Sequence, residues 1–225
     1  MNVALIVFAG KGIRLGSQIP KQFLKVAGRD VVAYTIEKFE QHPLIDNIVL
    51  VTSEDYISYT QNMVFSNRFT KVVKIVKGGE TRQESVLFGL RAIDASDNDL
   101  VLIHDGDRPL IKDELITKCI KGINNPHNDG VVVAIKSENE IPEVKNLGRK
   151  VERNNILYDI QTPQCFKTNY IKLLHEKYKD ATVSDDASLV EKEGGYVALI
   201  DGDPYNFKIT TNEDLQFFKK IIEEK

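Results

Sequence analysis

Six short runs rich in valine and isoleucine constrain the fold of this 225-residue chain more than any other feature of its sequence. They are Val3–Phe8, Ile48–Thr52, Val72–Val76, Leu100–Ile103, Val131–Ile135 and Tyr196–Ile200. Continuous apolar runs of this length suit strands that are covered on both faces, as in a parallel sheet. Stretches with helical spacing lie between them, such as Gln83–Ile93 and the C-terminal segment after the expected N-cap Thr211. The pattern predicts an α/β sandwich with right-handed crossovers.

Length, charge and cysteine content narrow the class of protein further. The length fits one large domain or two small ones, and we predict a single domain over residues 1–225. The 30 basic and 33 acidic side chains give a net charge of −3, which argues against a non-specific nucleic-acid binder. No apolar run approaches the ~20 residues of a membrane helix, and the N-terminus lacks the features of a signal peptide. Cys119 and Cys165 are too few for a disulfide framework or a structural zinc site, so we expect a cytoplasmic protein. From the charge balance and the short apolar runs, we expect it to bind neither nucleic acid nor membrane.

One polar segment, Ser137–Asp159, interrupts the alternation of strands and helices. Loops longer than ~12–15 residues without structure of their own are uncommon and usually functional. A long surface excursion is the simpler interpretation, but we predict a projecting hairpin in which Ile141–Val144 pairs with Lys150–Leu157 across Asn146, Leu147 and Gly148. Such an arm cannot bury a core alone, so residues 137–159 are expected to pack on a second subunit.

The first apolar run leads into a glycine-rich turn, Ala9–Gly16, that suits an anionic ligand. Glycines allow the backbone to approach closely, and the amides of the turn can face phosphate oxygens. The spacing matches neither the dinucleotide fingerprint nor the P-loop, and a plain strand-to-helix turn is the alternative. Arg14 and Lys21 follow closely, and two cations here would repel each other unless an anion such as a triphosphate lay between them.

Polar residues follow the fourth apolar run in His104–Pro109, at a position where open α/β sheets bind ligands. Asp105 is placed to hold a Mg²⁺ ion that bridges phosphates, because hard cations take carboxylate oxygens. Arg108 is expected to grip a second phosphate. The alternative is an Asp–Arg pair that only closes a turn.

Two further stretches are candidates for ligand contact. Gly78–Ser85 is a glycine-rich loop before a helix and suits backbone recognition of a base edge, although a simple turn capped by Thr81 explains it equally well. Asn206–Thr210 carries Lys208 after an aspartate-rich turn, where a surface lysine is the simpler interpretation. Neither stretch identifies a ligand by itself.

Taken in order, these stretches resemble a known family. The matching pieces are Ala9–Arg14, Pro20–Leu24, Gly78–Ser85, His104–Pro109, Gln161–Gln164, Ser184–Ala187 and Asn206–Thr210. The chain resembles the CTP-dependent cytidylyltransferases that include 2-C-methyl-D-erythritol 4-phosphate cytidylyltransferase and ribitol-5-phosphate cytidylyltransferase. The resemblance implies a Rossmann-like, mostly parallel twisted sheet with helices on both faces and a protruding β-arm that builds a homodimer. It also implies CTP as a substrate and Mg²⁺ as a cofactor.

The resemblance implies a set of residues around the triphosphate of CTP. Ala9, Gly10 and Gly12 would cradle the triphosphate. Arg14 and Lys21 would stabilise charge at the α-phosphate during catalysis.

The resemblance also implies residues around the base and the second substrate. Cytosine would contact Gly79, Glu80 and Ser85, with Arg82 nearby. Asp105 would serve both the metal and the polyol. The second substrate would be surrounded by Arg108, Lys208, Arg153 and Thr162, the last two from the other subunit.

Two departures from the family pattern bear on the acceptor. Gly106 and Asp107 replace the usual small residues of the His104–Pro109 stretch, and the extra carboxylate should weaken anion binding unless it points away or binds metal. Ser137–Asn139 replaces an Asp-Thr pair that helps hold the substrate's hydroxyls in the methylerythritol enzymes. His42–Asp46 looks more like the branch that acts on polyol phosphates.

We therefore predict transfer of CMP from CTP to an alditol phosphate similar to ribitol 5-phosphate. Pyrophosphate would leave, and the CDP-alditol would serve cell-surface polysaccharide or teichoic acid synthesis. The alternative acceptor is 2-C-methyl-D-erythritol 4-phosphate of isoprenoid synthesis. A nucleotide sensor that kept the fold is disfavoured by the intact Arg14, Lys21 and Asp105. A dinucleotide-dependent oxidoreductase is disfavoured by the misplaced third glycine.

Overall fold

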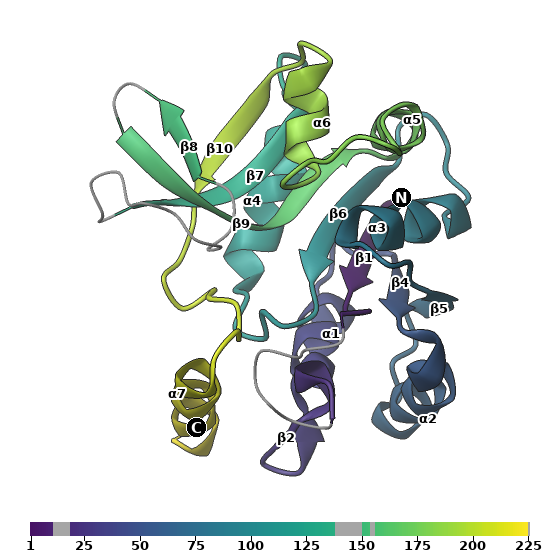
Figure 1. Ribbon diagram of the computed structural model, residues 1–225, viewed down its shortest axis with the longest axis vertical. Coiled ribbons are helices and arrows are strands. Elements are labelled where there is room, and N and C mark those ends of the chain that lie inside the picture. The colour runs from purple at the N-terminus through teal and green to yellow at the C-terminus, as the bar shows by residue number, and fades with distance from the viewer. Residues whose placement is uncertain (11–18, 138–149, 154–155, 225) are drawn as a thin grey trace.

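The computed structural model describes residues 1–10, 19–137, 150–153 and 156–224, with the backbone alone for 150–153 and 156. A twisted sheet of eight strands forms its centre (Figure 1). The strands are β1 (Asn2–Val7), β4 (Asn47–Thr52), β5 (Val72–Lys77), β6 (Leu100–Asp105), β7 (Gly130–Lys136), β8 (Lys150–Arg153), β9 (Ile156–Lys167) and β10 (Val197–Asp201). Seven of them lie in the order β10-β7-β9-β6-β1-β4-β5, and β8 pairs with the outer part of β9.

The sheet is mostly parallel, as the apolar runs predict. β6, β1, β4 and β5 run parallel to one another, and so do β7 and β10. Within this sheet, the antiparallel pairs among the described strands all involve β9, which opposes β6, β7 and β8. A separate small hairpin joins β2 (Lys25–Val26) to β3 (Arg29–Asp30) through Ala27 and Gly28, both of which have positive φ.

Helices cover both faces of the sheet, which confirms the predicted α/β class. One face is covered by α1 (Val31–Gln41), α2 (Ile57–Asn67) and α4 (Asp113–Ile123). The other face is covered by α3 (Arg82–Ala92), α5 (Thr168–Lys177) and α6 (Ala187–Lys192). Successive residues of β1 pack on opposite faces, with Ile6 in the first core and Leu5 in the second. This alternation explains why the strand is apolar at every position.

The remaining elements lie at the lower end of the molecule in Figure 1. Two short 3₁₀ turns, η2 (Lys21–Phe23) and η3 (Glu54–Tyr56), follow Pro20 and Ser53. Helix α7 (Asn212–Glu223) begins at Thr211, the predicted N-cap, whose hydroxyl accepts a hydrogen bond from the Asp214 amide. The Asp214 carboxylate accepts in return from the Thr211 amide, which completes a capping box.

The sequence prediction missed strand β9. Its residues include Pro163 and several polar side chains, and both features argue against a central strand. The predicted strand Lys150–Leu157 is also wrong, because β8 ends at Arg153 and β9 begins at Ile156, so that the two halves pair with each other. The expected partner Ile141–Val144 lies outside the described residues.

Both cysteines pack inside the core as predicted. Cys119 and Cys165 are buried free thiols, and burial raises the pKa of Cys119 to about 12. Within the described ranges, none of the helices combines the length and the apolar character that a bilayer crossing requires.

Candidate active site

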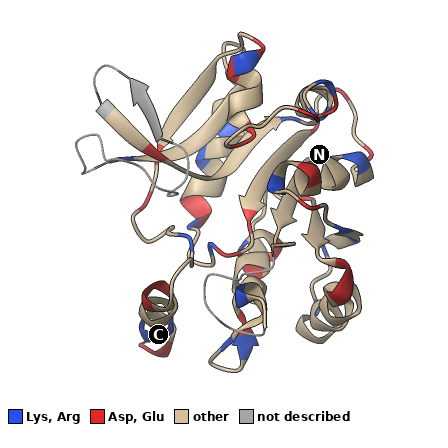
Figure 2. Cartoon of the chain, in the orientation of Figure 1, with Lys and Arg blue, Asp and Glu red and all other residues tan. Residues whose placement is uncertain are grey.

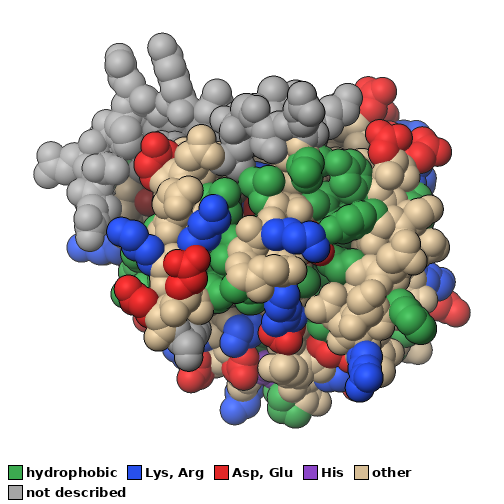
Figure 3. Space-filling model, turned by 90° about the horizontal axis from the view of Figure 1, so that it is seen from below, with side chains coloured by type: hydrophobic (Ala, Val, Ile, Leu, Met, Phe, Trp, Pro, Cys, Tyr) green, Lys and Arg blue, Asp and Glu red, His purple; other side chains and the backbone are tan. Residues whose placement is uncertain are grey.

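Charged side chains gather at the carboxyl end of β6, the middle strand of the sheet (Figure 1). β6 ends at Asp105, which lies beside Val7 at the end of the parallel strand β1. Figure 2 shows acidic and basic segments meeting at this end of β6, and Figure 3 shows the same end of the molecule from below. Open α/β sheets bind ligands at the carboxyl ends of their strands. In this chain the same end of the sheet carries acidic and basic side chains at close range.

Three cations surround the Asp105 carboxylate. Lys208 Nζ lies 2.9 Å from Oδ2, Arg108 Nε lies 3.6 Å from Oδ2, and Arg82 Nε lies 3.1 Å from Oδ1. Burial alone would raise the pKa of Asp105, but Lys208, Arg82 and Arg108 outweigh it and hold that pKa well below its usual range. Asp105 therefore stays ionised and holds three cations from different parts of the chain side by side.

Arg82 connects Asp105 to a second buried carboxylate, Asp186. Arg82 Nη2 lies 2.9 Å from Asp186 Oδ2, and Asp186 Oδ1 lies 3.1 Å from His175 Nε2. Partial burial would lower the pKa of Arg82, but the two carboxylates raise it above its ordinary value. Burial would raise the pKa of Asp186, but Arg82 and His175 lower it. The row of four side chains links α5 and the start of α6 to the end of β6.

Asp107 points into the site. Its Oδ2 lies 2.6 Å from Lys21 Nζ, and its Oδ1 lies 3.8 Å from Lys208 Nζ. Lys21 is the first residue of η2, directly after Pro20. The extra carboxylate noted in the sequence therefore faces two of the lysines predicted to contact phosphate.

Strand β9 brings Thr162 beside Asp105 of the same chain. The pairing of β7 with β9 shifts register between Val132 and Ala134, opposite residues 161–163, and the Thr162–Pro163 peptide is cis. Bulges of this kind re-aim side chains, and the Thr162 hydroxyl accepts a hydrogen bond from the Asp105 amide at 3.1 Å. Thr162 was predicted to act from the other subunit, whereas within its own chain β9 lies between β6 and β7 and places Thr162 beside Asp105.

His104 is a neutral imidazole with a defined tautomer. Its Nε2 lies 3.2 Å from the carbonyl oxygen of Arg108, which can only accept, so Nε2 carries the proton. Nδ1 then accepts from the Thr162 hydroxyl at 3.0 Å. Burial lowers the pKa of His104 to about 4. Because both ring nitrogens are engaged by the protein, His104 orients Thr162 and is not placed as a general base.

The buried side chain of Gln22 fixes the start of the glycine-rich turn. Its amide nitrogen donates to the carbonyl oxygens of Phe8 at 2.7 Å and Gly10 at 2.8 Å. The backbone of Ala9 and Gly10 is therefore tied to η2, which also carries Lys21. The predicted residues Gly12 and Arg14 lie outside the described residues.

The Gly78–Ser85 stretch, which consists of the loop after β5 and the first turn of α3, packs directly on this turn. A Cβ atom at Gly78 would lie 2.3 Å from the Cβ of Ala9 and 2.9 Å from Ser85 Oγ. Only glycine therefore fits at this position without a shift of its neighbours. The segments predicted to contact the base and the triphosphate are adjacent in the fold.

Hydrogen bonds within the loop hold its shape. The Gly79 amide donates to Ser85 Oγ at 3.0 Å, and the Glu80 amide donates to Glu84 Oε2 at 2.7 Å. Thr81 caps α3, as the simpler interpretation of this stretch predicts. Capping and base contact are compatible, because the cap uses the Thr81 hydroxyl and leaves the backbone carbonyls of Gly79 and Glu80 to other partners.

Most of the predicted site residues are brought together. Six of them meet at the end of β6, namely Lys21, Arg82, Asp105, Arg108, Thr162 and Lys208. Ala9 and Gly10 lie on the adjoining turn after β1, Gly79 and Glu80 lie on the loop after β5, and Ser85 lies in the first turn of α3. The Arg153 side chain lies outside the described residues.

Sequence reasoning assigned no role to Gln22 or Asp186. Both fall inside stretches that match the family, Pro20–Leu24 and Ser184–Ala187, and that match was the only signal available. Arg82 and Asp186 are 104 positions apart in the sequence, so their contact depends on the folded chain.

Asp105 does not offer open ligand atoms to a metal ion. Each of its two carboxylate oxygens faces a cation within 3.1 Å. Across the described ranges, no three His, Cys, Asp or Glu side chains are grouped so that they could hold a metal. The residues present do not fit a resident Mg²⁺ site, so the predicted role of Asp105 as a metal ligand lacks support in this geometry.

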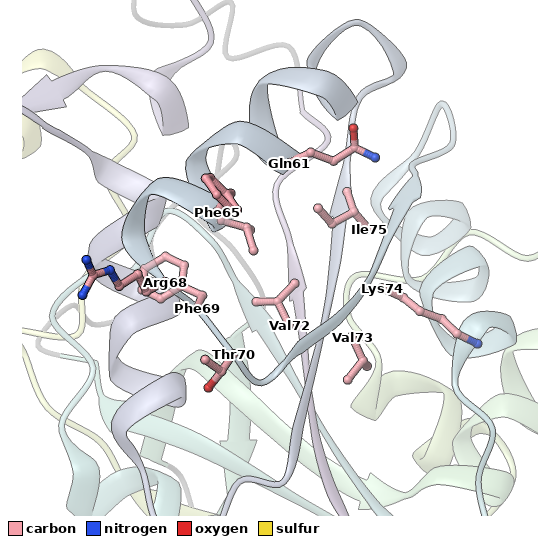
Figure 4. Close-up of a pocket in the computed structure, with 10 residues that line it drawn as sticks. Gln61, Phe65, Arg68, Phe69, Thr70, Val72, Val73, Lys74 and Ile75 are labelled. Carbon is pink, nitrogen blue, oxygen red and sulfur yellow. The ribbon is translucent and has the colours of Figure 1, made fainter.

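A cavity of about 550 Å³ lies away from these charges, between helix α2 and the edge strand β5 (Figure 4). Its lining is mainly apolar and includes Phe65, Phe69, Val72 and Ile75. No residue predicted to bind substrate lines it. Convergent charge, and not cavity size, therefore marks the candidate site.

Comparisons with known proteins relate the whole chain to one family, in sequence and in fold. A family model described as IspD, 2-C-methyl-D-erythritol 4-phosphate cytidylyltransferase, matches residues 2–224. A relative of that name from Clostridium novyi (strain NT) is 41% identical over 225 residues, which cover 99% of this chain and 96% of the relative. Another from Clostridium botulinum (strain 657 / Type Ba4) is 39% identical and covers 99% and 98%.

Solved structures give the same result. A 4-diphosphocytidyl-2C-methyl-D-erythritol synthase from Anaerococcus prevotii DSM 20548 matches with a TM-score of 0.80 at 30% identity and covers 99% of this chain and 98% of that one. The Francisella tularensis 2-C-methyl-D-erythritol 4-phosphate cytidylyltransferase matches with a TM-score of 0.79 at 27% identity, covering 97% and 98%. The fold and these matches define a nucleotidyltransferase, and more narrowly a CTP-dependent cytidylyltransferase. The predicted enzyme class is confirmed. The chain belongs to the 2-C-methyl-D-erythritol 4-phosphate cytidylyltransferase family.

Proposed function

We propose that the chain transfers CMP from CTP to 2-C-methyl-D-erythritol 4-phosphate. The products are 4-diphosphocytidyl-2-C-methyl-D-erythritol and pyrophosphate. The names of the relatives and of the solved structures support this acceptor over ribitol 5-phosphate, which the sequence analysis favoured.

The convergence of four cations at the end of β6 is the observation that carries the proposal. Lys21, Arg82, Arg108 and Lys208 come from four separate segments and meet around Asp105 and Asp107. Two substrates that both carry phosphate need such a site, because their negative charges repel each other when they approach. Fixed cations lower that repulsion and stabilise the charge that develops on the α-phosphate and the leaving pyrophosphate.

The reaction needs no general base from the protein. The acceptor phosphate is already ionised, and one of its oxygens attacks the α-phosphorus of CTP while the bond to pyrophosphate breaks. The protein positions the two substrates in line and neutralises charge. The neutral, buried His104 agrees with this scheme, since its two nitrogens are used by Thr162 and Arg108.

The proposal keeps the predicted roles for the residues at the nucleotide. Ala9, Gly10 and Gly12 cradle the triphosphate, with Arg14 and Lys21 at the α-phosphate. The base contacts Gly79, Glu80 and Ser85, with Arg82 nearby.

At the second substrate, the proposal assigns Arg108, Lys208 and Thr162 to one subunit and Arg153 to the other subunit of a homodimer built by the 137–159 arm. That dimer, the single domain and a cytoplasmic location remain predictions. Mg²⁺ dependence also remains a prediction, and because both oxygens of Asp105 face cations, the ion is expected to enter as the counter-ion of CTP.

The stretch that favoured a polyol phosphate has a structural explanation. His42 Nε2 contacts the Asp113 carbonyl oxygen at 3.2 Å and Thr117 Oγ1 at 3.0 Å, and its Nδ1 accepts from the Leu44 amide. Asp46 accepts from the amide of Asn2, at the amino end of β1. The stretch therefore links α1 to α4 and to the amino end of β1, whereas Asp105 lies at the carboxyl end of the neighbouring strand β6. These contacts give no information on the acceptor.

A turnover assay tests the proposal. The purified chain is incubated with CTP, Mg²⁺ and either 2-C-methyl-D-erythritol 4-phosphate or ribitol 5-phosphate, and pyrophosphate release is measured. We expect kcat/KM for the first acceptor to exceed that for the second by at least about a hundredfold, as is typical of sites that hydrogen-bond their substrate's hydroxyls. Equal or reversed values would restore the ribitol hypothesis, and no pyrophosphate with either would refute cytidylyl transfer.

A further inference from the structure

The ion pair between Asp107 and Lys21 is the strongest feature of the site that the proposed reaction does not explain. Lys21 Nζ lies 2.6 Å from Asp107 Oδ2. Only 11% of the Lys21 side chain and 12% of the Asp107 side chain are exposed, so solvent screens the pair poorly. A carboxylate this close to a lysine that serves a phosphate should weaken the binding of phosphate, and it needs a reason.

Lys21 is held at a second point by the backbone of the segment that precedes α7. Its Nζ donates to the carbonyl oxygen of Ile209 at 2.5 Å, and the Ile209 amide donates to the carbonyl oxygen of Asp107 at 2.9 Å. Asp107 and Ile209 are thus tied to each other as well as to Lys21. A lysine ammonium has three N–H donors, and this arrangement uses two of them, which leaves the third for a ligand.

The second carboxylate oxygen of Asp107 lies close to another lysine of the site, Lys208. Asp107 Oδ1 is buried and has no hydrogen-bond partner among the described residues, and it lies 3.8 Å from Lys208 Nζ. Lys208 Nζ is shared with Asp105 at 2.9 Å. The carboxylates of Asp105, the last residue of β6, and of Asp107 therefore hold Lys21 and Lys208 at fixed places.

We propose that Asp107 is a positioning residue that fixes the Lys21 ammonium for the α-phosphate, at the expense of affinity for CTP. This rests on the proposed function, because it assumes that Lys21 acts on the transferred phosphate. Long lysine side chains are flexible, and a group that holds one in place preserves the alignment that charge stabilisation requires. The negative charge of Asp107 meanwhile repels the triphosphate in the ground state.

The proposal predicts opposite effects on binding and turnover, which a general loss of structure would not produce. Asp107→Asn keeps the size of the side chain and removes its charge. Calorimetry without acceptor should show that this variant binds CTP several-fold more tightly than the wild type. Its kcat should be about tenfold lower, which corresponds to a loss of about 1.4 kcal/mol of transition-state stabilisation. Asp107→Ala serves as the second variant if the first unfolds. Looser CTP binding, or an unchanged kcat in a folded variant, would overturn the proposal.

A comparison in the Lys21→Ala background tests whether Asp107 acts through Lys21. In that background, Asp107→Asn should cause no further fall in kcat, because the positioned group is already missing. An equal fall in both backgrounds would show that Asp107 acts independently of Lys21. Glu193→Gln is the matched control, since it removes a carboxylate 2.7 Å from Lys177 at the surface and should leave CTP binding and turnover unchanged.

Chemical labelling separates a failure of this inference from a failure of the proposed function. A paired, nearly buried Lys21 should react slowly with an amine-acylating reagent, and Asp107→Asn should raise its labelling about tenfold, as judged by peptide mass spectrometry. Unchanged labelling would refute the positioning role even in an active enzyme. Increased labelling in a protein that releases no pyrophosphate would show that Asp107 holds Lys21 in place, and would refute the cytidylyl transfer that this positioning is proposed to serve.

Discussion

Gly78 and Ala9 approach so closely that a Cβ atom on Gly78 would lie 2.3 Å from the Cβ of Ala9. This contact joins the loop after β5 to the turn after β1. The two segments proposed to bind the base and the triphosphate therefore meet where the Ala9 methyl group packs against the Gly78 backbone.

Gly78→Ala should destabilise the protein by about 1–3 kcal/mol, because both loops must shift to admit the methyl group. The free energy of unfolding from urea denaturation measures the effect. Gly10→Ala is the matched control, since no atom of the residues that the structure describes lies within 4 Å of its Cβ position. A similar loss of stability in both variants would show that close packing at Gly78 is not the cause.

Removal of Arg82 should be strongly destabilising. Arg82→Met leaves Asp105 and Asp186 without their shared cation, and breaking a buried pair typically costs about 3–5 kcal/mol. Arg91 lies on the same helix and also pairs with a carboxylate, Glu176, at 2.6 Å, but both partners are exposed. The urea midpoint of Arg91→Met should therefore stay close to that of the wild type. Equal midpoints for the two variants would contradict the role of Arg82.

Lys21→Ala should lower turnover far more than it weakens CTP binding. If the ammonium acts on the transition state, its loss should reduce kcat about 10²–10³-fold, by analogy with oxyanion donors. In the ground state Asp107 offsets much of the charge of Lys21, so the dissociation constant of CTP should change little. Steady-state kinetics and calorimetry supply the two values. Losses of equal size in both would argue against a role in the transition state.

The Gln22 amide should be replaceable only by a group that can donate. Gln22→Glu presents a carboxylate to the carbonyl oxygens of Phe8 and Gly10, and an ionised carboxylate can only accept. The variant should lose about 1–3 kcal/mol relative to the wild type near neutral pH. This deficit should shrink in acid, where the carboxyl group is protonated and can donate. A deficit that does not depend on pH would contradict this assignment.

Burial of neutral His104 makes stability depend on pH. Its pKa is about 4 in the folded chain against 6.5 in the unfolded one, so the unfolded chain binds more protons between these values. The free energy of unfolding should therefore fall as pH drops from 6.5 to 4, by about 3 kcal/mol from this group. His104→Gln should flatten the curve in this window. An unchanged slope in that variant would assign the pH dependence to other groups.

The sequence was sufficient for the elements whose signal is local. The valine-rich runs predict six strands of the sheet, and the Thr211 cap predicts the start of α7, because burial on two faces and capping are properties of short segments. β9 was missed because its stabilisation comes from β6 and β7, on either side of it, and its own residues include a proline.

In the site, as in the fold, features with a local sequence signal could be predicted and features that depend on the folded chain could not. Lys21, Arg82, Asp105 and Lys208 could be selected as candidates, since each stands in a recognisable stretch. The pairing of Lys21 with Asp107 could not be predicted, because it depends on where η2 lies relative to β6 in the folded chain.

Strand β9 belongs to two parts of the molecule at once. Its outer residues from Ile156 to Asp159 pair with β8, and its inner residues from Gln164 to Lys167 pair with β6. Thr162 lies between these two ladders and hydrogen-bonds to Asp105. Any group that binds the outer ladder and any ligand that touches Thr162 would therefore contact one and the same strand.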